Sequence, residues 1–508
     1  MKYCEPESGG GNCMRESGVL LPVASLPSAY GIGCFSKEAY AFVDWLKAAG
    51  QSYWQILPLG PTSYGDSPYQ SFSTFAGNPY FIDLEDFIAR GYLTREICDS
   101  YDFGDNEEYI DYGKIYHSRF LVLKEAWKNS NIAEDEEFQA FVQENSYWIK
   151  DYALYMAVKD SLEGVCWIDW DEDIKIRKPE ALRQYRKKFD KEIEFYQFQQ
   201  YMFHIQWAKL KNYANERGIQ LIGDIPIYVA LDSADAWANP KLFQFDENSN
   251  PIAVAGCPPD AFSATGQLWG NPLYDWPYHK KTGYKWWMKR LEACFERYDV
   301  VRIDHFRGFD AYYSIPAGAQ TAQVGAWEPG PGYGFFAAMK KHLGERRVIA
   351  EDLGFLTPSV LELVKQTGYP GMKVLQFAFD SREDSDYLPH NYPRNCVVYT
   401  GTHDNDTTLG WYSALVWHDK EFCKKYLHLE KCDDRESAWE LIRAALASVA
   451  DLAVIPLQDY LGAGAEARIN IPSTLGNNWK WRMKKGACTD ELAWRMRELA
   501  GLYGRVHN

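Results

Sequence analysis

Apolar residues recur along this chain in short runs that alternate with longer stretches of helical period. Runs of about four to eight apolar, often β-branched residues are typical of strands. Eight such runs cover residues 53–59, 78–84, 220–229, 299–306, 346–354, 372–379, 395–404 and 451–462. Continuous apolar runs indicate strands that are covered on both faces, as in a parallel sheet. Eight of them separated by helices predict an α/β fold, a (β/α)8 TIM barrel with helical and loop insertions, rather than an open doubly wound sheet.

The same pattern divides the chain into regions. Residues 17–84 and 205–508 are predicted to form the catalytic barrel, and the charged, helix-periodic residues 85–204 a mainly helical insertion subdomain. Residues 256–277 are rich in rings and turn formers, and we expect an aromatic loop insertion over the active site. The Gly-rich, polar residues 1–16 are predicted to be a flexible tail.

Composition narrows the class of function. The chain has 508 residues, of which 16% are aromatic, more than a core requires, and flat rings are suited to stacking against sugars. A net charge of −16 disfavours nucleic acids and anionic membranes as partners. Eleven cysteines without a C-x-x-C pair indicate reduced thiols, and neither a secretory signal nor a membrane span is visible, so a cytoplasmic location is expected.

Ionisable residues gather at the trailing ends of the predicted strands. In (β/α)8 barrels the carboxyl ends of the strands carry the active site, and acids there are costly unless they are paired or used. These positions are Asp224, the Arg302–His305 segment, Glu351 with Asp352, His403 with Asp404, and Gln458 with Asp459. Together they predict a catalytic site built from several strands.

Strand alternation separates two of these carboxyls by environment. Arg302 and Asp304 share one face, and a neighbouring guanidinium favours the charged carboxylate that a nucleophile requires. Glu351 follows an apolar run, where burial would raise its pKa and keep it protonated, as a general acid requires. Because Glu351 and Asp352 cannot both face the barrel axis, we prefer the longer Glu351. Two carboxyls shifted in opposite directions are typical of glycosidic bond cleavage.

Two ring-rich loops agree with a sugar substrate. Residues 60–80 and 256–277 combine Tyr, Phe and Trp with Gly, Ser and Pro. The rings either pack the loops onto the barrel or stack against sugars, and for the two loops jointly we favour stacking.

Several segments resemble one known family closely. They are LPLGPTSYGDSPYQSFSTFAGNPY, LIGDIPIYV, PPDAFSATGQLWGNPLYDW, RIDHFRG, AEDLG, GTHDN and NIPSTLGNNWKWR. In this order, from about residue 19 to 482, they resemble the 4-α-glucanotransferases, the amylomaltase or disproportionating-enzyme family of glycoside hydrolase family 77. The resemblance implies a retaining α-glucan enzyme related to the α-amylase superfamily.

The resemblance also implies roles for individual residues. Asp304 would be the nucleophile, Glu351 the general acid/base, and Asp404 the acid that stabilises the transition state. The remaining matches are substrate contacts: Arg302, His403 and Asp224 at the −1 sugar, and Tyr64, Asp66, Trp269 and Asn470 along the donor and acceptor sites. His305 is either a sugar contact or a structural histidine. Small residues at Ala261 and Ala264, where some members carry an aromatic and an acid, leave the grip on the acceptor open.

The sequence therefore predicts transfer of α-1,4-glucan segments between maltooligosaccharides or chains of amylose, starch or glycogen, by double displacement, with cyclisation as a variant. No cofactor, metal, nucleic acid or membrane is expected, and monomer and homodimer stay open. An α-glucan hydrolase or branching enzyme on the same scaffold is the nearest alternative. A barrel metallohydrolase, disfavoured by the lack of H-x-H or H-E-x-x-H spacing, and a non-catalytic glucan-binding protein are more distant ones.

Overall fold

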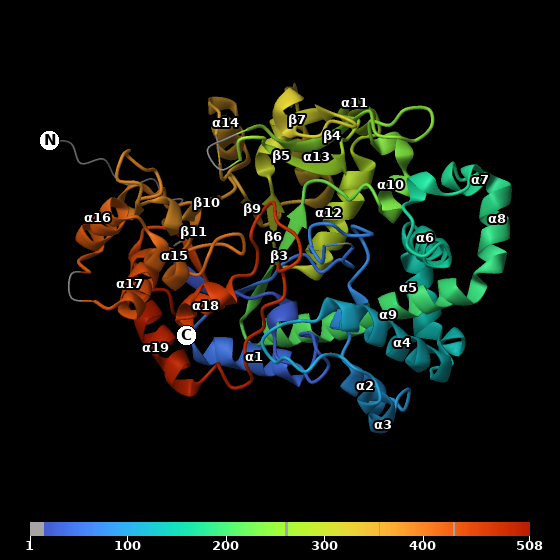
Figure 1. Ribbon diagram of the computed structural model, residues 1–508, viewed down its shortest axis with the longest axis horizontal. Helices are drawn as coiled ribbons and strands as arrows, with labels where there is room; N and C mark the ends of the chain where they lie inside the picture. The colour runs from blue at the N-terminus through green and yellow to red at the C-terminus, as the bar shows by residue number, and fades with distance from the viewer. Residues whose placement is uncertain (1–14, 64, 260–262, 355, 430–431, 508) are drawn as a thin grey trace.

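A computed structural model describes residues 15–63, 65–259, 263–354, 356–429 and 432–507. Eight parallel strands form a nearly closed barrel, with β3, β6 and β9 at the centre of Figure 1. In spatial order the strands are β10 (Gly371–Val374), β11 (Cys396–Tyr399), β12 (Leu452–Pro456), β1 (Glu16–Leu20), β2 (Tyr53–Gln55), β3 (Gln220–Pro226), β6 (Val300–Asp304) and β9 (Val348–Ala350). The two ends of this order meet where the Ala350 N–H donates to the Pro370 carbonyl, at 2.9 Å. The predicted (β/α)8 barrel is confirmed.

One of the eight predicted strands is wrong. Residues 78–84 hold the 3₁₀ helix Pro79–Phe81, because the Asn78 side chain accepts the Tyr80 N–H and caps a turn. The missing strand is β1, which pairs with both β2 and β12. Its first residue, Glu16, falls within the predicted tail. The polar start and the glycine of this segment hide its strand character, which depends on pairing with its two neighbours. Residues 1–14 of the predicted tail lie outside the described residues.

Helices surround the barrel as the alternating pattern predicted. The first, α1 (Lys37–Ala48), buries Ala39, Phe42, Val43 and Leu46, and it ends just before Gly50, whose φ of +69° suits glycine. The other helices outside the insertion are α10 (Ala234–Ala238), α11 (Trp276–Lys281), α12 (Lys285–Arg297), α13 (Tyr333–Leu343), α14 (Pro358–Thr367), α15 (Thr408–Ala414), α16 (Trp417–Leu427), α17 (Asp434–Ala447), α18 (Leu457–Tyr460) and α19 (Asp490–Leu502). In the described part of the chain, no helix is long and apolar enough to cross a membrane.

The segment between β2 and β3 is helical and forms the right-hand side of Figure 1. It consists of α2 (Leu84–Ala89), α3 (Arg95–Asp99), α4 (Tyr112–Asn129), α5 (Glu136–Glu144), α6 (Ile149–Ser161), α7 (Glu172–Lys175), α8 (Pro179–Lys188) and α9 (Asp190–Glu216). The long helix α9 buries Phe195, Phe198 and Met202 and leads directly into β3. It crosses residue 204, the predicted boundary, so insertion and barrel share one continuous helix.

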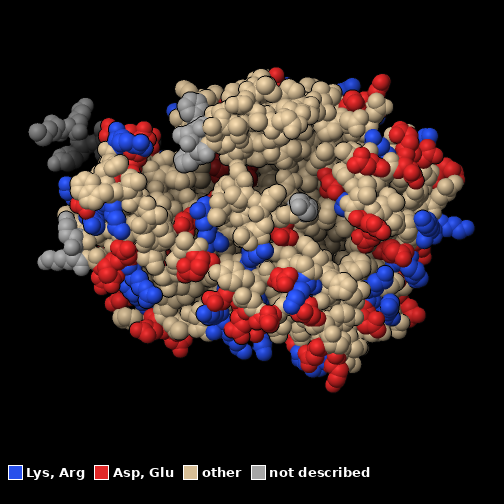
Figure 2. Space-filling model, in the orientation of Figure 1, with Lys and Arg blue, Asp and Glu red and all other residues tan. Residues whose placement is uncertain are grey.

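A second sheet, which the sequence pattern did not predict, lies above the barrel. It is antiparallel, in the order β5 (Gln267–Pro272), β4 (Ala253–Cys257), β7 (Ala311–Pro316), β8 (Ala326–Pro329). Residues 256–277, predicted as a loop, thus contain the end of β4, all of β5 and the start of α11, because β4 pairs with the distant β7 and β5 then pairs with β4. This upper lobe shows few charged side chains, which are more numerous on the sides and along the lower part of the molecule in this view (Figure 2).

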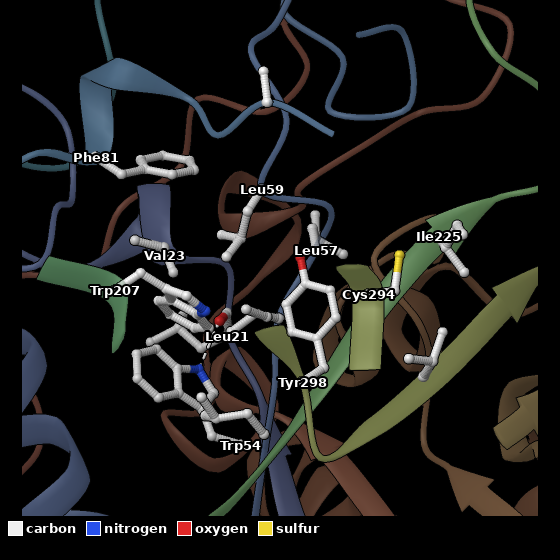
Figure 3. Packing of buried hydrophobic residues seen from close by; sticks show 14 of the residues in the cluster. Leu21, Val23, Trp54, Leu57, Leu59, Phe81, Trp207, Ile225, Cys294 and Tyr298 are labelled. Atoms are coloured by element: carbon white, nitrogen blue, oxygen red, sulfur yellow. Dashed lines mark hydrogen bonds between the residues drawn. The ribbon is translucent and has the colours of Figure 1, made fainter. Parts of the chain in front are cut away.

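Two layers of side chains make the core. Outside the barrel wall, Trp54 and Trp207 lie close to Leu21 in a cluster that also includes Tyr298 and Ile225 (Figure 3). The Trp54 indole donates to the Leu21 carbonyl at 2.8 Å. Inside the barrel, the strands contribute a separate apolar plug: Leu20, Tyr53, Ile222, Val300, Ile349, Met372, Val397, Tyr399 and Val454. Neighbours in sequence such as Tyr53 and Trp54 thus face opposite sides, as strand alternation requires.

Candidate active site

The carboxyl ends of β3, β6 and β9 bring the first group of predicted residues together. Asp224 lies beside Arg302 in the register of β3 and β6, and Ile303 beside Ala350 in that of β6 and β9. Arg302 Nη1 is 2.6 Å from Asp224 Oδ2 and 3.0 Å from Asp304 Oδ1. The Arg302 and Asp224 side chains are buried, whereas that of Asp304 is 30% exposed. One guanidinium therefore compensates two carboxylates, of which only Asp304 is open to a ligand.

Glu351 occupies the position next to Asp304 on the neighbouring strand. Its Oε2 accepts the His305 N–H at 2.7 Å, and its Oε1 accepts the Leu353 N–H at 2.9 Å. Asp352 turns away and accepts the Met372 N–H of β10, at 2.7 Å. The structure thus places Glu351, and not Asp352, beside Asp304.

The electrostatics of the two carboxyls differ from the prediction in one respect. Burial raises the pKa of Asp304 to about 6, although the Arg302 guanidinium lowers it. Burial and then the charge of Asp304 raise the pKa of Glu351 to about 7. The predicted shifts in opposite directions are wrong, because Arg302 divides its charge between Asp304 and the fully buried Asp224 and does not outweigh burial. The pKa of Asp304 is still the lower of the two, so Asp304 loses its proton before Glu351 does.

A second group comes from the loops after β11 and β12. Asn470 Nδ2 donates to Asp404 Oδ1 at 2.6 Å, and His403 Nε2 lies 3.4 Å from the same oxygen. His403 is buried, whereas the Asp404 side chain is 47% exposed. Arg468 joins the two loops, because its guanidinium donates to the backbone carbonyls of both Asp404 and Asn470 at 2.7 Å. The sequence pattern did not single out Arg468, which differs from surface arginines only by its place two residues before Asn470.

Tyr69 connects the two groups. Its hydroxyl donates to Asp224 Oδ2 at 2.8 Å, and its ring stacks on that of His403, with centroids 5.2 Å apart. Trp479 lies against both rings, 5.9 Å from each. In the sequence, Tyr69 is one of several rings in the 60–80 loop, and Trp479 lies within the last motif. The abundance of rings in the loop was the signal, but it could not show which ring reaches the acids.

The other predicted contacts lie farther out. Trp269, on β5, meets the His305 ring edge-on at 4.9 Å. Asp66 accepts the Tyr116 hydroxyl of α4, and with Trp479 it lines a small cavity of about 30 Å³. Tyr64 and Ala261 lie outside the described residues. Of the predicted set, the structure therefore brings six side chains into direct contact in two groups, Asp224, Arg302 and Asp304 in one and His403, Asp404 and Asn470 in the other.

His305 holds its neighbours through its backbone. It has a φ of +54°, in the left-handed region that few residues adopt, and this turn directs its N–H at Glu351. Burial lowers the pKa of its ring to about 3, so the imidazole is neutral near pH 7.

In the described part of the chain, no three His, Cys, Asp or Glu side chains are grouped to hold a metal ion.

Asp459, the acid on the last predicted strand, joins neither of the two groups. Its carboxylate accepts from the Thr400 and Thr408 hydroxyls, at 2.6 and 2.7 Å, and from the Thr408 N–H at 2.7 Å. It is buried and fixes the two ends of the loop that carries Asp404.

The chain is similar to known proteins over almost its full length. The family described as 4-alpha-glucanotransferase matches residues 21–489. The 4-alpha-glucanotransferase of Clostridium butyricum is 49% identical over 485 residues, which cover 95% of this chain and 99% of that protein. That of Thermus thermophilus is 47% identical over 495 residues, with 96% and 98% covered. The structure of an amylomaltase from Streptococcus agalactiae in complex with acarbose has a TM-score of 0.94 and 41% identity, with 97% and 100% covered.

Proposed function

Because this chain belongs to the 4-α-glucanotransferase family, we propose that it transfers α-1,4-glucan segments by double displacement. The reaction would take place between the two groups of side chains described above, and we call this place the cleft. The observation that supports this most is the pair of carboxyls on adjacent strand ends, with Asp304 ion-paired to Arg302 and Glu351 retaining its proton to a higher pH. A retaining reaction requires a separation of about 5–5.5 Å between such groups.

In the first step the Asp304 carboxylate attacks the anomeric carbon of the donor. The bond from that carbon to the glycosidic oxygen breaks, and Glu351 gives its proton to the departing oxygen. The product is a covalent β-glucosyl-enzyme and a shorter glucan with a new 4-hydroxyl. The backbone N–H groups of His305 and Leu353 donate to the Glu351 carboxyl and fix the direction in which its proton is offered.

In the second step a 4-hydroxyl of another glucan enters. Glu351, now a carboxylate, takes the proton from that hydroxyl, and the oxygen attacks the anomeric carbon. The bond to Asp304 breaks, and two inversions restore the α configuration. When donor and acceptor ends belong to one chain, the same step closes a ring.

The second group of residues would bind the sugar at the reacting carbon. Asp404 is exposed to the cleft and held by Asn470 and His403, which suits it to accept hydrogen bonds from sugar hydroxyls and to stabilise positive charge in the transition state. The Tyr69 ring, rigid between Asp224 and His403, would cover the same sugar. Preference for a sugar over water would follow from rings that exclude solvent and bind the acceptor.

We further propose α-1,4-glucans such as maltooligosaccharides, amylose, starch or glycogen as substrates, and the cytoplasm as location. The acarbose bound to the similar amylomaltase supports a carbohydrate in this cleft. The buried Cys34, Cys98, Cys294, Cys396 and Cys423 are free thiols, in keeping with a reducing compartment.

Incubation with maltotriose as the sole sugar tests the function. A transferase produces glucose together with longer maltodextrins, whereas a hydrolase produces only shorter sugars, and a branching enzyme creates α-1,6 linkages that proton NMR detects. Asp304→Asn is expected to abolish turnover while the protein stays folded. Asp299→Asn, at the opposite end of the strand and bonded to Asn215 and the Leu221 N–H, is the matched control and should remain active. Shorter sugars alone would refute the proposal, and so would full activity of Asp304→Asn.

A further inference from the structure

The helical insertion carries a lysine whose charge is buried. The side chain of Lys159, on α6, is 6% exposed and forms an ion pair with Asp232. Its ammonium also donates to the Gly164 carbonyl at 2.8 Å. The other carboxylate oxygen of Asp232 accepts the Tyr155 hydroxyl, also from α6. Because a buried ammonium is costly and apolar side chains fill such sites more cheaply, this ion pair calls for a role beyond packing.

Asp232 belongs to the segment that follows β3, and this segment holds the middle of the aromatic loop 60–80. The Ala234 N–H donates to the Phe72 carbonyl at 2.8 Å, and Asp235 accepts the Thr74 N–H at 2.7 Å. The Lys159 ammonium lies 5.2 Å from the centroid of the Phe72 ring, within the range of a cation–π contact. Lys159 thus contacts both the segment and the loop that the segment holds.

The loop leads from this contact to the cleft in three residues. Phe72 lies three residues after Tyr69 in the loop. The Tyr69 hydroxyl donates to Asp224, and its ring stacks on that of His403. The loop between them is short, so a shift of Phe72 moves the Tyr69 ring and hydroxyl. A misplacement of about 1 Å at a reacting centre can cost a hundredfold in rate.

We propose that Lys159 is a positioning residue for glucan transfer: paired with Asp232 beneath Phe72, it fixes the loop that presents Tyr69 to Asp224 and His403. The helical insertion then sets the geometry of the cleft from outside the barrel. This inference rests on the proposed function, because it assigns a further residue to the same reaction.

The test compares Lys159→Met, which keeps an apolar stem but loses the charge, with Lys159→Arg and Asp232→Asn. Lys211→Met is the matched control, because Lys211 also pairs with an aspartate, Asp299, at 3.6 Å with only 16% of its side chain exposed, but on α9 and at the other end of the barrel. For each variant, kcat and KM are measured with maltotriose, and folding is measured by thermal unfolding.

Lys159→Met and Asp232→Asn are expected to lower kcat about tenfold with little change in KM, since the ground-state contacts remain and the transition state loses an aligned group. Lys159→Arg should recover most of the rate, and Lys211→Met should keep it. The decisive measurement is made in the Tyr69→Ala background, where both the ring and the hydroxyl that Lys159 positions are already absent. There Lys159→Met should lower kcat by no more than about twofold.

An equal tenfold loss in both backgrounds would overturn the proposal, because Lys159 would then act independently of Tyr69. Unchanged kcat in folded Lys159→Met would also overturn it. If Lys159→Met does not fold, Asp232→Asn decides by the same comparison. These failures differ from failure of the proposed function, in which the unmodified protein itself would not convert maltotriose into longer glucans.

Discussion

The protonated state of Glu351 should be visible in the stability of the protein. Burial and the charge of Asp304 raise the pKa of Glu351 from its usual 4.5 to about 7. Between these two pH values the folded state keeps a proton that the unfolded state has released. Stability contributed by this proton is complete below about pH 4.5 and is lost as the pH rises to about 7. Glu351→Gln cannot ionise, so the variant should lack this decline.

The size of the effect follows from the shift in pKa. Each unit corresponds to 1.36 kcal/mol, so the charged form of Glu351 costs the folded state up to about 3 kcal/mol at pH 8. Unfolding entropy near 60 °C is about 2.1 cal/mol/K per residue, so for 508 residues that unfold together 1 kcal/mol corresponds to about 1 °C. The difference in unfolding midpoint, Glu351→Gln minus unmodified protein, should therefore rise by about 3 °C when the pH is raised from 4.5 to 8.

The assay is thermal unfolding of both proteins at a series of pH values. Only the pH dependence of the difference is diagnostic, because the Gln side chain cannot accept from both the His305 and Leu353 N–H groups and so carries a constant penalty of about 1–3 kcal/mol. Glu345→Gln, an exposed site just before β9, is the control and should track the unmodified protein. A difference that is constant from pH 4.5 to 8, or that falls as the pH rises, would refute the reasoning.

Other measurements probe the same structure. The kcat/KM of the unmodified enzyme should follow a bell-shaped curve against pH, because the pKa values of the Asp304 and Glu351 carboxyls are about 6 and about 7. It should fall by up to about tenfold per pH unit below pH 6 and above pH 7. A flat profile from pH 4.5 to 8.5 would contradict this. Asn470→Ala should lower kcat about 10- to 100-fold, since the Asp404 carboxylate loses its closest donor; an unchanged kcat would count against this role. Gly223→Ala should destabilise the fold by about 1–3 kcal/mol in denaturant unfolding, because the added Cβ would lie 2.1 Å from the Tyr298 ring, whereas Gly334→Ala, with open space around its Cβ, should not.

Local pattern was enough to predict most of the barrel and the acids at its mouth. Seven of the eight strands contain the predicted apolar runs or parts of them, because a strand buried on both faces must be apolar throughout. The acids Asp304 and Glu351 could be placed at one end of the barrel, because parallel strands all finish at the same rim.

The misses share a physical cause. The strand β1 is recognisable only between β2 and β12, and β5 only once β4 has paired with β7. Residues 78–84 have the apolar content of a strand but no free neighbour in the sheet, and a side-chain cap turns them into a 3₁₀ helix. A pairing partner that is distant in the sequence leaves no periodic signal in the strand that it completes, so neither β1 nor β5 could be recognised from its own residues.

The sequence by itself determined the parallel barrel, the carboxyls at its rim and the rings in the loops above it. These follow from burial and alternation, which act within a few residues. Only the tertiary structure decided how the carboxyls behave and which ring reaches them. The pKa of Asp304 depends on how Arg302 divides its charge with Asp224, and Tyr69 lies against Asp224 and His403, which are far from it in the chain. Charge and steric contact act through space between residues that are distant in the chain. Neither the pKa of Asp304 nor the place of Tyr69 can therefore be predicted from a local stretch of sequence.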